Sequence, residues 1–117
     1  MTLDHLESTA DLDAAIARSA ESPVFLFKHS TRCPVSFAAE AAYLKFVNAL
    51  PKDAAVVCTH LDLIRHRDVS SAIADTLGVH HQSPQAILVV DGRAVWNASH
   101  YDIDGDSLAA ALAAAAG

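Results

Sequence analysis

Two short apolar stretches with a helical pattern between them limit the folds open to this chain. Residues 24–27 and 54–61 are rich in strand-forming side chains, and residues 24–27 show no polar alternation, which is typical of a strand buried on both faces. Between them, apolar side chains recur at helical spacing, at Phe37, Ala41, Leu44, Val47 and Leu50. With Pro34 suited to a first helical turn, the pattern predicts a helix over 34–50 inside a parallel strand–helix–strand unit.

The flanking segments predict three more helices and a hairpin. Helices are predicted at 11–20 and 68–77, the second ending at a left-handed Gly78, and strands at 86–90 and 94–96 around the turn Asp91-Gly92. A last helix is predicted from Asp104 onwards, with Leu108 and Leu112 docking on the sheet. Residues 1–117 are therefore expected to form a single α/β domain with a mixed sheet.

Charge and hydropathy exclude several classes of partner. The 8 basic and 14 acidic residues give a net charge of −6, and no two basic residues are adjacent, so neither nucleic acid nor an acidic membrane surface is expected as a partner. No run of 18 apolar residues occurs, and Met1–His5 lacks the pattern of an export signal. We therefore expect a cytoplasmic protein with reduced thiols.

The motif Cys33-Pro34-Val35-Ser36 carries the chemistry. A cysteine where a strand passes into a helix lies beside unpaired N–H groups and the positive helix end, which favour a thiolate. Dithiol motifs have a second cysteine where this chain has Ser36, so one-cysteine exchange is predicted. The basic neighbours Arg32, Lys28 and His29 are candidates for stabilising the sulfur, and Ser36 either hydrogen-bonds it or is a solvated first-turn residue.

The cysteines, the histidines and two aromatic residues can also be explained without a functional role. Cys33 itself would pack as a buried free cysteine if it were not functional, and Cys58, inside the apolar run 54–61, is expected to be such a core residue. The seven histidines lack the close spacing of a zinc site, so we expect them scattered over the surface and loops, with no metal. Trp96 and Tyr101 are expected to pack under the last helix.

The cysteine at the start of the helix, together with Ser83-Pro84 before the hairpin, resembles the thioredoxin superfamily. This resemblance implies a thioredoxin-like sandwich, with a central mixed four-stranded sheet flanked by helices. It also implies a cis peptide at Pro84, which would lie beside Cys33 and leave the backbone of Ser83 free to pair with an extended substrate.

Three strings narrow the resemblance to the YtxJ-like, or monothiol bacilliredoxin, family, over nearly the whole chain. They are Lys28-His29-Ser30-Thr31-Arg32-Cys33-Pro34-Val35-Ser36, Ser83-Pro84-Gln85-Ala86 and Val95-Trp96-Asn97-Ala98-Ser99-His100.

The family resemblance implies removal of bacillithiol from protein mixed disulfides. Cys33 would be the catalytic residue, S-bacillithiolated client proteins the partners and bacillithiol the thiol co-substrate, with no tightly bound cofactor. The residues implied to support the substrate are Thr31, Arg32, Pro34, Ser36, Ser83 and Pro84. A binding function remains the alternative, either as an iron–sulfur cluster carrier or as a redox-inactive adaptor. Cluster-binding monothiol glutaredoxins usually show Cys-Gly-Phe-Ser, from which Cys33-Pro34-Val35-Ser36 departs.

Overall fold

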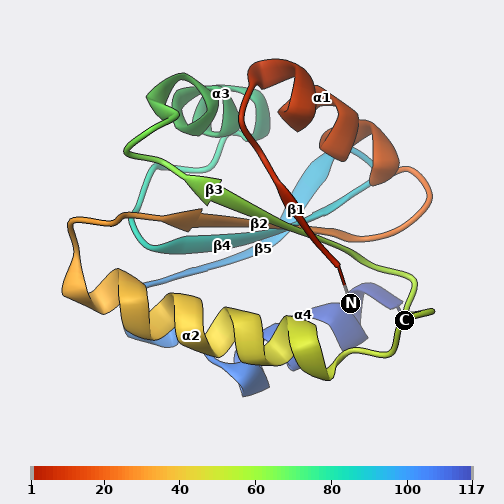
Figure 1. Cartoon of the computed structure of the whole chain (residues 1–117). Coiled ribbons are helices and arrows are strands. Elements are labelled where there is room, and N and C mark those ends of the chain that lie inside the picture. Colours follow the sequence, from red (N-terminus) through yellow and green to blue (C-terminus); the bar gives the residue numbers. More distant parts are fainter. Residues whose placement is uncertain (1, 117) are drawn as a thin grey trace.

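The computed structural model describes residues 2–116, which form a five-stranded sheet between two layers of helices (Figure 1). The elements in chain order are β1 (Leu3–His5), α1 (Thr9–Arg18), β2 (Val24–His29), α2 (Pro34–Ala49), β3 (Val57–Asp62), α3 (Arg67–Leu77), β4 (Gln85–Val90), β5 (Arg93–Ser99), the 3₁₀ turn η1 (His100–Asp102) and α4 (Gly105–Ala116).

The sheet has the strand order β1-β3-β2-β4-β5. β3 is parallel to β1 and β2, whereas β4 is antiparallel to β2 and β5. All six residues of β2 are buried, so the prediction of a central strand within a parallel unit is confirmed. The predicted hairpin is confirmed as well, with Asp91 and Gly92 at φ of 51° and 75°, as a tight primed turn requires.

The prediction of four strands is wrong, because β1 adds a fifth at the edge of the sheet. This strand is only three residues long and contains Asp4 and His5. It pairs with β3 from Cys58 to His60 through backbone groups, and so short a strand carries no apolar pattern that a sequence could reveal.

Several element ends differ from the sequence prediction. α1 begins two residues early because Ser8 caps it, its side chain accepting from Asp11 N at 3.1 Å. β2 runs two residues longer than predicted, since Lys28 and His29 are buried strand residues despite their polarity. α3 ends as predicted at Gly78, at φ 67°. The predicted start of α4 is confirmed by reciprocal hydrogen bonds between Asp104 and Ser107.

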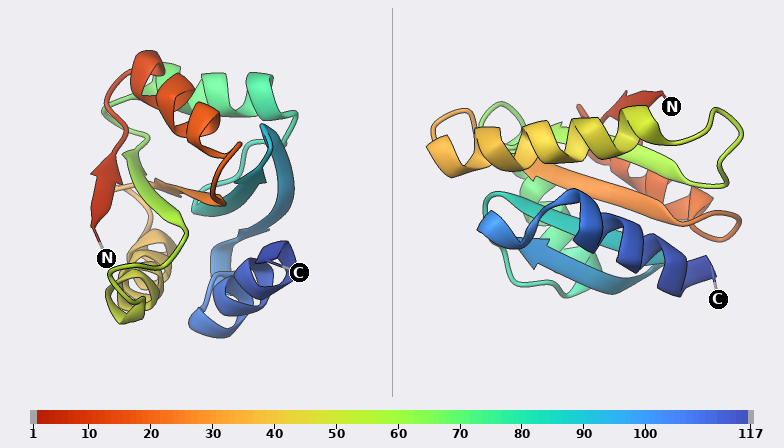
Figure 2. Two further views of the ribbon diagram at one scale, coloured as in Figure 1. Left: turned by 90° about the vertical axis from the view of Figure 1, so that its right-hand side faces the viewer. Right: turned by 90° about the horizontal axis from the view of Figure 1, so that it is seen from below.

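Each face of the sheet has its own apolar core, one under α1 and α3 and one under α2 and α4 (Figure 2). In β2, Leu26 packs in the first core, whereas Phe25 and Phe27 pack in the second. Trp96 packs against the second core as predicted. Tyr101, in η1, is 78% exposed, so its predicted burial under α4 is wrong.

The side of α2 that faces the core also differs from the prediction. Phe37 is 51% exposed and Ala41 is exposed, whereas the buried side chains are those of Ser36, Ala39, Tyr43 and Val47. An alanine-rich helix has little apolar contrast between its faces, so the periodicity located the helix but not its orientation. In the described part of the chain, no helix has both the length and the apolar character needed to span a bilayer.

Candidate active site

Cys33 is the N-cap residue of α2, at the end of the loop that leaves β2. Its N–H donates to the carbonyl of Ser30 (3.3 Å), and its own carbonyl accepts from Ser36 N (3.0 Å). No side-chain cap hydrogen bond occurs at this helix start, and the residue is partly exposed. No side chain therefore competes with a thiolate at Cys33 for the positive end of the helix dipole.

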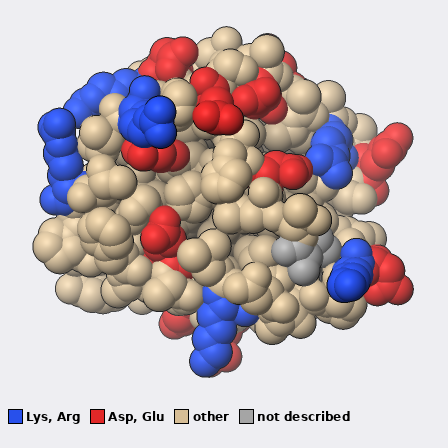
Figure 3. Space-filling model, viewed as in Figure 1, with Lys and Arg blue, Asp and Glu red and all other residues tan. Residues whose placement is uncertain are grey.

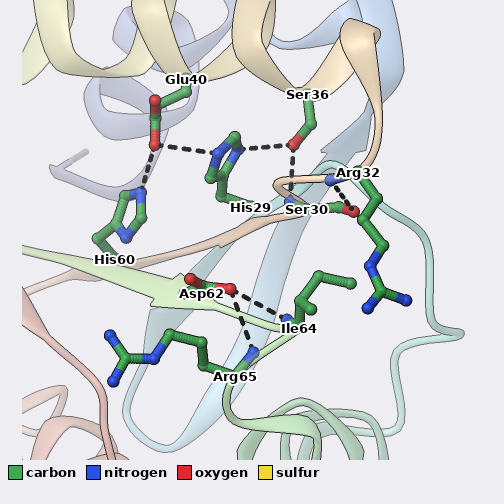
Figure 4. Close-up of polar contacts among 9 residues, drawn as sticks. All are labelled: His29, Ser30, Arg32, Ser36, Glu40, His60, Asp62, Ile64 and Arg65. Carbon is green, nitrogen blue, oxygen red and sulfur yellow. Dashed lines mark hydrogen bonds and ion pairs between the residues drawn. The ribbon is translucent and has the colours of Figure 1, made fainter.

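The loop residues before and after Cys33 are open to solvent. Thr31, Arg32 and Pro34 are exposed, and Pro34 occupies the first turn of α2 as predicted. The Arg32 N–H donates to Ser30 Oγ (3.3 Å), while the Arg32 side chain points away from the polar cluster beneath α2 (Figure 4).

Ser36 is fully buried, so its interpretation as a solvated residue is wrong. Its Oγ accepts from Ser30 N (2.9 Å) and is 2.8 Å from Nδ1 of His29. The hydroxyl thus ties the start of the loop, at the end of β2, to the first turn of α2.

A polar cluster continues from His29 across the underside of α2 (Figure 4). Glu40 Oε2 lies 3.5 Å from Nε2 of His29 and 2.7 Å from Nε2 of His60 on β3. His29 and His60 are 5% and 12% exposed at the side chain, so the prediction that histidines are confined to surface and loops is wrong for these two. Across residues 2–116, no group of three or more His, Cys, Asp or Glu side chains is arranged to hold a metal ion.

The Ser83–Pro84 peptide bond is cis, as the family resemblance implied. β4 starts at Gln85, which pairs with Lys28, so Pro84 lies opposite His29 at the end of β2 from which the Cys33 loop departs. The Pro84 carbonyl accepts from His100 N (3.1 Å), which ties η1 to this corner. Ser83 Oγ is buried without a hydrogen-bond partner among the described residues.

Lys28 lies on the opposite face of the sheet from His29, because neighbouring strand residues point to opposite sides. It is fully buried, and its Nζ donates to Nδ1 of His81 (2.7 Å) and to Oε1 of Gln85 (3.0 Å). Gln85 Nε2 in turn donates to the carbonyl of His80 (3.0 Å). Lys28 therefore holds the loop before the cis peptide rather than the Cys33 sulfur.

Burial shifts the pKa values of two groups in the cluster formed by Lys28, His81 and Gln85. It lowers the pKa of Lys28 from 10.5 to about 8, because the charged amine has left water. The pKa of His81 is also lowered, first by burial and then by the nearby charge of Lys28. A neutral His81 is the form that can accept from the ammonium group.

Cys58 is buried within β3, as predicted. Burial raises its pKa from 9.0 to about 11, so it remains a thiol at neutral pH. Both cysteines are free. Of the two, only Cys33 is exposed enough to meet a partner.

The roles of Glu40, Gln85, His60 and His81 were not predicted from the sequence. One signal was available: Ser36 and Glu40 are four residues apart, which places both on one face of a helix. The contacts of His60 and of the loop before Pro84 depend on strand pairing and leave no local pattern.

A thiol at the N-terminus of the helix after a central strand, with a cis-proline opening the neighbouring strand, defines a thioredoxin-fold protein. Solved structures agree. A proposed oxidoreductase with a thioredoxin fold is 36% identical, with a TM-score of 0.81 over 93% of this chain and 92% of that one. Thioredoxin from Malassezia sympodialis (17% identity, TM-score 0.73, 97% and 90% covered) and thioredoxin f from spinach chloroplast, long form (15%, 0.75, 99% and 88%), share the fold.

A match to a sequence family narrows the class of protein further than the fold does. The sequence model of the family described as monothiol bacilliredoxin BrxC matches residues 4–108. This chain is a member of that family. Membership and fold together support a role in thiol redox chemistry.

Proposed function

We propose that this protein removes bacillithiol from mixed disulfides on client proteins, with Cys33 as the nucleophile. The observation that carries the proposal is a partly exposed thiol at the N-cap of α2, where no side chain competes for the first-turn N–H groups. Family membership supports bacillithiol as the thiol partner. Two free cysteines are consistent with a reducing compartment such as the cytoplasm.

The exchange is a displacement at sulfur. The Cys33 thiolate attacks the bacillithiol sulfur of the mixed disulfide, the client's sulfur leaves as a thiolate that takes up a proton, and a Cys33–bacillithiol disulfide remains. A second bacillithiol thiolate then attacks this disulfide, releases Cys33 and forms bacillithiol disulfide. Because Ser36 replaces a second cysteine and Cys58 is buried in the sheet, regeneration needs an external thiol.

The corner around Pro84 is the proposed contact for the client. The backbone of Ser83, at the cis peptide, would pair with an extended client segment. The unpartnered Ser83 Oγ lies at the same place. Thr31, Arg32 and Pro34 are exposed beside the thiol and would border that segment. On the face drawn in Figure 3, acidic and basic side chains are interspersed, so client choice would depend on this local corner more than on a long-range field.

The test is transfer of the adduct. The protein is mixed with a model client that carries one bacillithiolated cysteine, and intact masses of both are followed. We expect the client to lose the adduct while Cys33 gains it, and added bacillithiol to restore the free thiol. Cys33→Ser should abolish transfer, whereas Cys58→Ala should retain it.

Two results would contradict the proposal. An adduct that stays on the client while Cys33 remains unmodified would favour a redox-inactive adaptor. A coloured protein after anaerobic purification, with iron and sulfide bound through Cys33, would favour a cluster carrier.

A further inference from the structure

The loop that leads into the cis peptide has few hydrogen bonds to hold it. Within residues 2–116, the backbone of residues 79–83 makes no hydrogen bond to another backbone group. The hydrogen bond that a described side chain makes to this backbone comes from Gln85, whose Nε2 donates to the carbonyl of His80 (3.0 Å). The backbone of Ser83 is therefore open to pairing with another strand, but the loop depends on a neighbouring side chain to keep its shape.

Gln85 provides this support from a fixed position. It is the first residue of β4, which lies between β2 and β5 (Figure 1). Its backbone pairs with Lys28 on β2 and with Ser99 on β5. Only 1% of the residue is exposed. The sheet thus holds Gln85 from both sides, while its side chain reaches back to the loop.

The partners of the Gln85 amide determine its orientation. Oε1 accepts from Nζ of Lys28 (3.0 Å), and an ammonium group can only donate, whereas the carbonyl of His80 can only accept. The amide oxygen therefore faces Lys28 and the amide nitrogen faces the loop. Lys28 also donates to Nδ1 of His81 (2.7 Å), so the amide and the ammonium together hold two consecutive loop residues.

We propose that Gln85 is a positioning residue that holds residues 80–83 in the shape in which Ser83 receives an extended client segment. The inference rests on the proposed function in taking the corner at Pro84 as the client contact. A loop that is already ordered binds a strand more tightly, because less conformational entropy is lost on binding. The Gln85 side chain contacts Lys28 and the loop, so it acts on client binding and leaves the reactivity of the thiol unchanged.

Gln85→Glu separates this role from a contribution to stability. The carboxylate keeps an acceptor for Lys28 and gives the ammonium a charged partner, which it lacks within residues 2–116. The variant loses the N–H donor, however, and places a negative charge against the carbonyl of His80. We expect Gln85→Glu to resist urea at least as well as the wild type and yet to bind a client segment less well. A residue that served stability alone would not separate the two results.

The test is the reaction of Cys33 with a short uncharged peptide whose single cysteine is activated as a mixed disulfide with thionitrobenzoate. The Cys33 thiolate attacks the peptide sulfur, a Cys33–peptide disulfide forms, and thionitrobenzoate leaves as a coloured thiolate. For Gln85→Glu, the half-saturating peptide concentration should rise about tenfold, whereas the limiting rate should change by less than about twofold. The thionitrobenzoate disulfide of cysteine alone needs no loop, so the variant and the wild type should react with it equally fast.

Asn97→Asp is the matched control. It makes the same change from amide to carboxylate on β5, in the surface hollow that Gln85 also lines, and it leaves the hydrogen bond from Gln85 to His80 in place. The half-saturating peptide concentration should stay at the wild-type value. A rise as large as that of Gln85→Glu would assign the effect to the added charge and overturn the proposal.

Gln85→Met is a second variant, which removes both polar contacts without adding a charge. It should also raise the half-saturating peptide concentration and keep the wild-type rate with the cysteine disulfide. An unchanged half-saturating concentration in either folded variant would overturn the proposal, as would a wild type that reacts with the peptide no faster than with the cysteine disulfide. None of these reactions uses bacillithiol, so failed bacillithiol transfer and failed loop positioning are separate results.

Discussion

Lys28 and His29 are neighbours in β2, yet they organise opposite faces of the sheet. Lys28 reaches into the face covered by α1 and α3 and holds the loop before Pro84 through His81 and Gln85. His29 reaches under α2 and holds the Cys33 loop through Ser36. One strand end therefore anchors both loops of the site, each by a buried polar side chain.

The two clusters differ in their charges. Within residues 2–116, no carboxylate lies within ion-pair distance of Lys28 Nζ, and burial lowers its pKa to about 8. The His29 cluster contains Glu40, which gives an imidazolium a partner. A buried charge without a charged partner lowers folding stability, whereas His29 contacts the residue that ties down the loop carrying Cys33. We therefore expect changes at Lys28 to act mainly on stability and changes at His29 mainly on reactivity.

The largest effect is expected from Lys28→Ala. The change removes a fully buried four-carbon stem and leaves Gln85 Oε1 without its donor. Cavity formation and the unpaired acceptor together should lower the free energy of unfolding by about 2–5 kcal/mol, as measured by urea denaturation. The loss should appear without any change in the rate at which iodoacetamide alkylates Cys33 in the folded protein, because Lys28 does not contact the Cys33 loop.

Lys28→Met distinguishes the contribution of the apolar part of the Lys28 side chain from that of its charge. Its apolar chain refills the space and removes the unpaired ammonium, so it should be more stable than Lys28→Ala. If the two variants were equally unstable, packing of the stem would not contribute, and the hydrogen bonds of the amine would carry the whole effect.

A second effect concerns stability at alkaline pH. The folded pKa of Lys28, about 8, is below its ordinary 10.5, so between these values the unfolded chain binds more protons and stability rises with pH. The gain is about 3 kcal/mol at most, at about 1.4 kcal/mol per pH unit. Cys58, whose pKa is raised to about 11, acts in the opposite direction above pH 9.

The difference in unfolding free energy between wild type and Lys28→Met removes the contribution of Cys58, because both proteins contain it. The wild type should therefore become more stable relative to Lys28→Met as the pH rises from 8 to 10. A difference that is constant over this range would show that the Lys28 amine titrates alike in the folded and unfolded chains.

The sequence predicted elements whose signals are local. The apolar run in β2, the proline and cysteine at the start of α2 and the Asp91-Gly92 turn each act within a few residues, and each was located correctly. β1 was missed because its stability comes from pairing with β3 rather than from its own three residues. Phe37 was placed in the core because small alanines dominate both sides of α2.

The position of Cys33 at the start of α2 was predictable for the same reason, but its polar surroundings were not. Lys28 and His29 follow four apolar residues, and two polar residues at that point normally indicate that a strand has ended. Their burial depends on partners 7 to 57 residues away in the chain. Such partners are brought together by strand pairing and by the packing of α2 on the sheet, so no local sequence pattern reveals them.

A smaller effect is expected from Ser36→Ala. Ser30 N–H loses its acceptor and His29 Nδ1 loses its hydrogen-bond partner, which should lower stability by about 1–2 kcal/mol. Amide hydrogen exchange should speed up at residues 30–33 and stay unchanged at residues 80–85, whereas Lys28→Met should give the reverse. Faster exchange in both loops for either variant would mean that the two clusters are one cooperative unit.

The smallest effect is expected from His81→Ala. His81 is exposed, so water can replace its ring as acceptor for Lys28, and the loss should stay below about 1 kcal/mol. Its pKa is lowered in the folded protein, so the unfolded chain binds the extra proton first and wild-type stability falls as the pH drops below 6.5. The variant should lose part of this acid sensitivity in denaturation curves at pH 5 and 7. An unchanged acid sensitivity would show that protonation of His81 does not cause it and that the Lys28 cluster does not control the response of stability to acid.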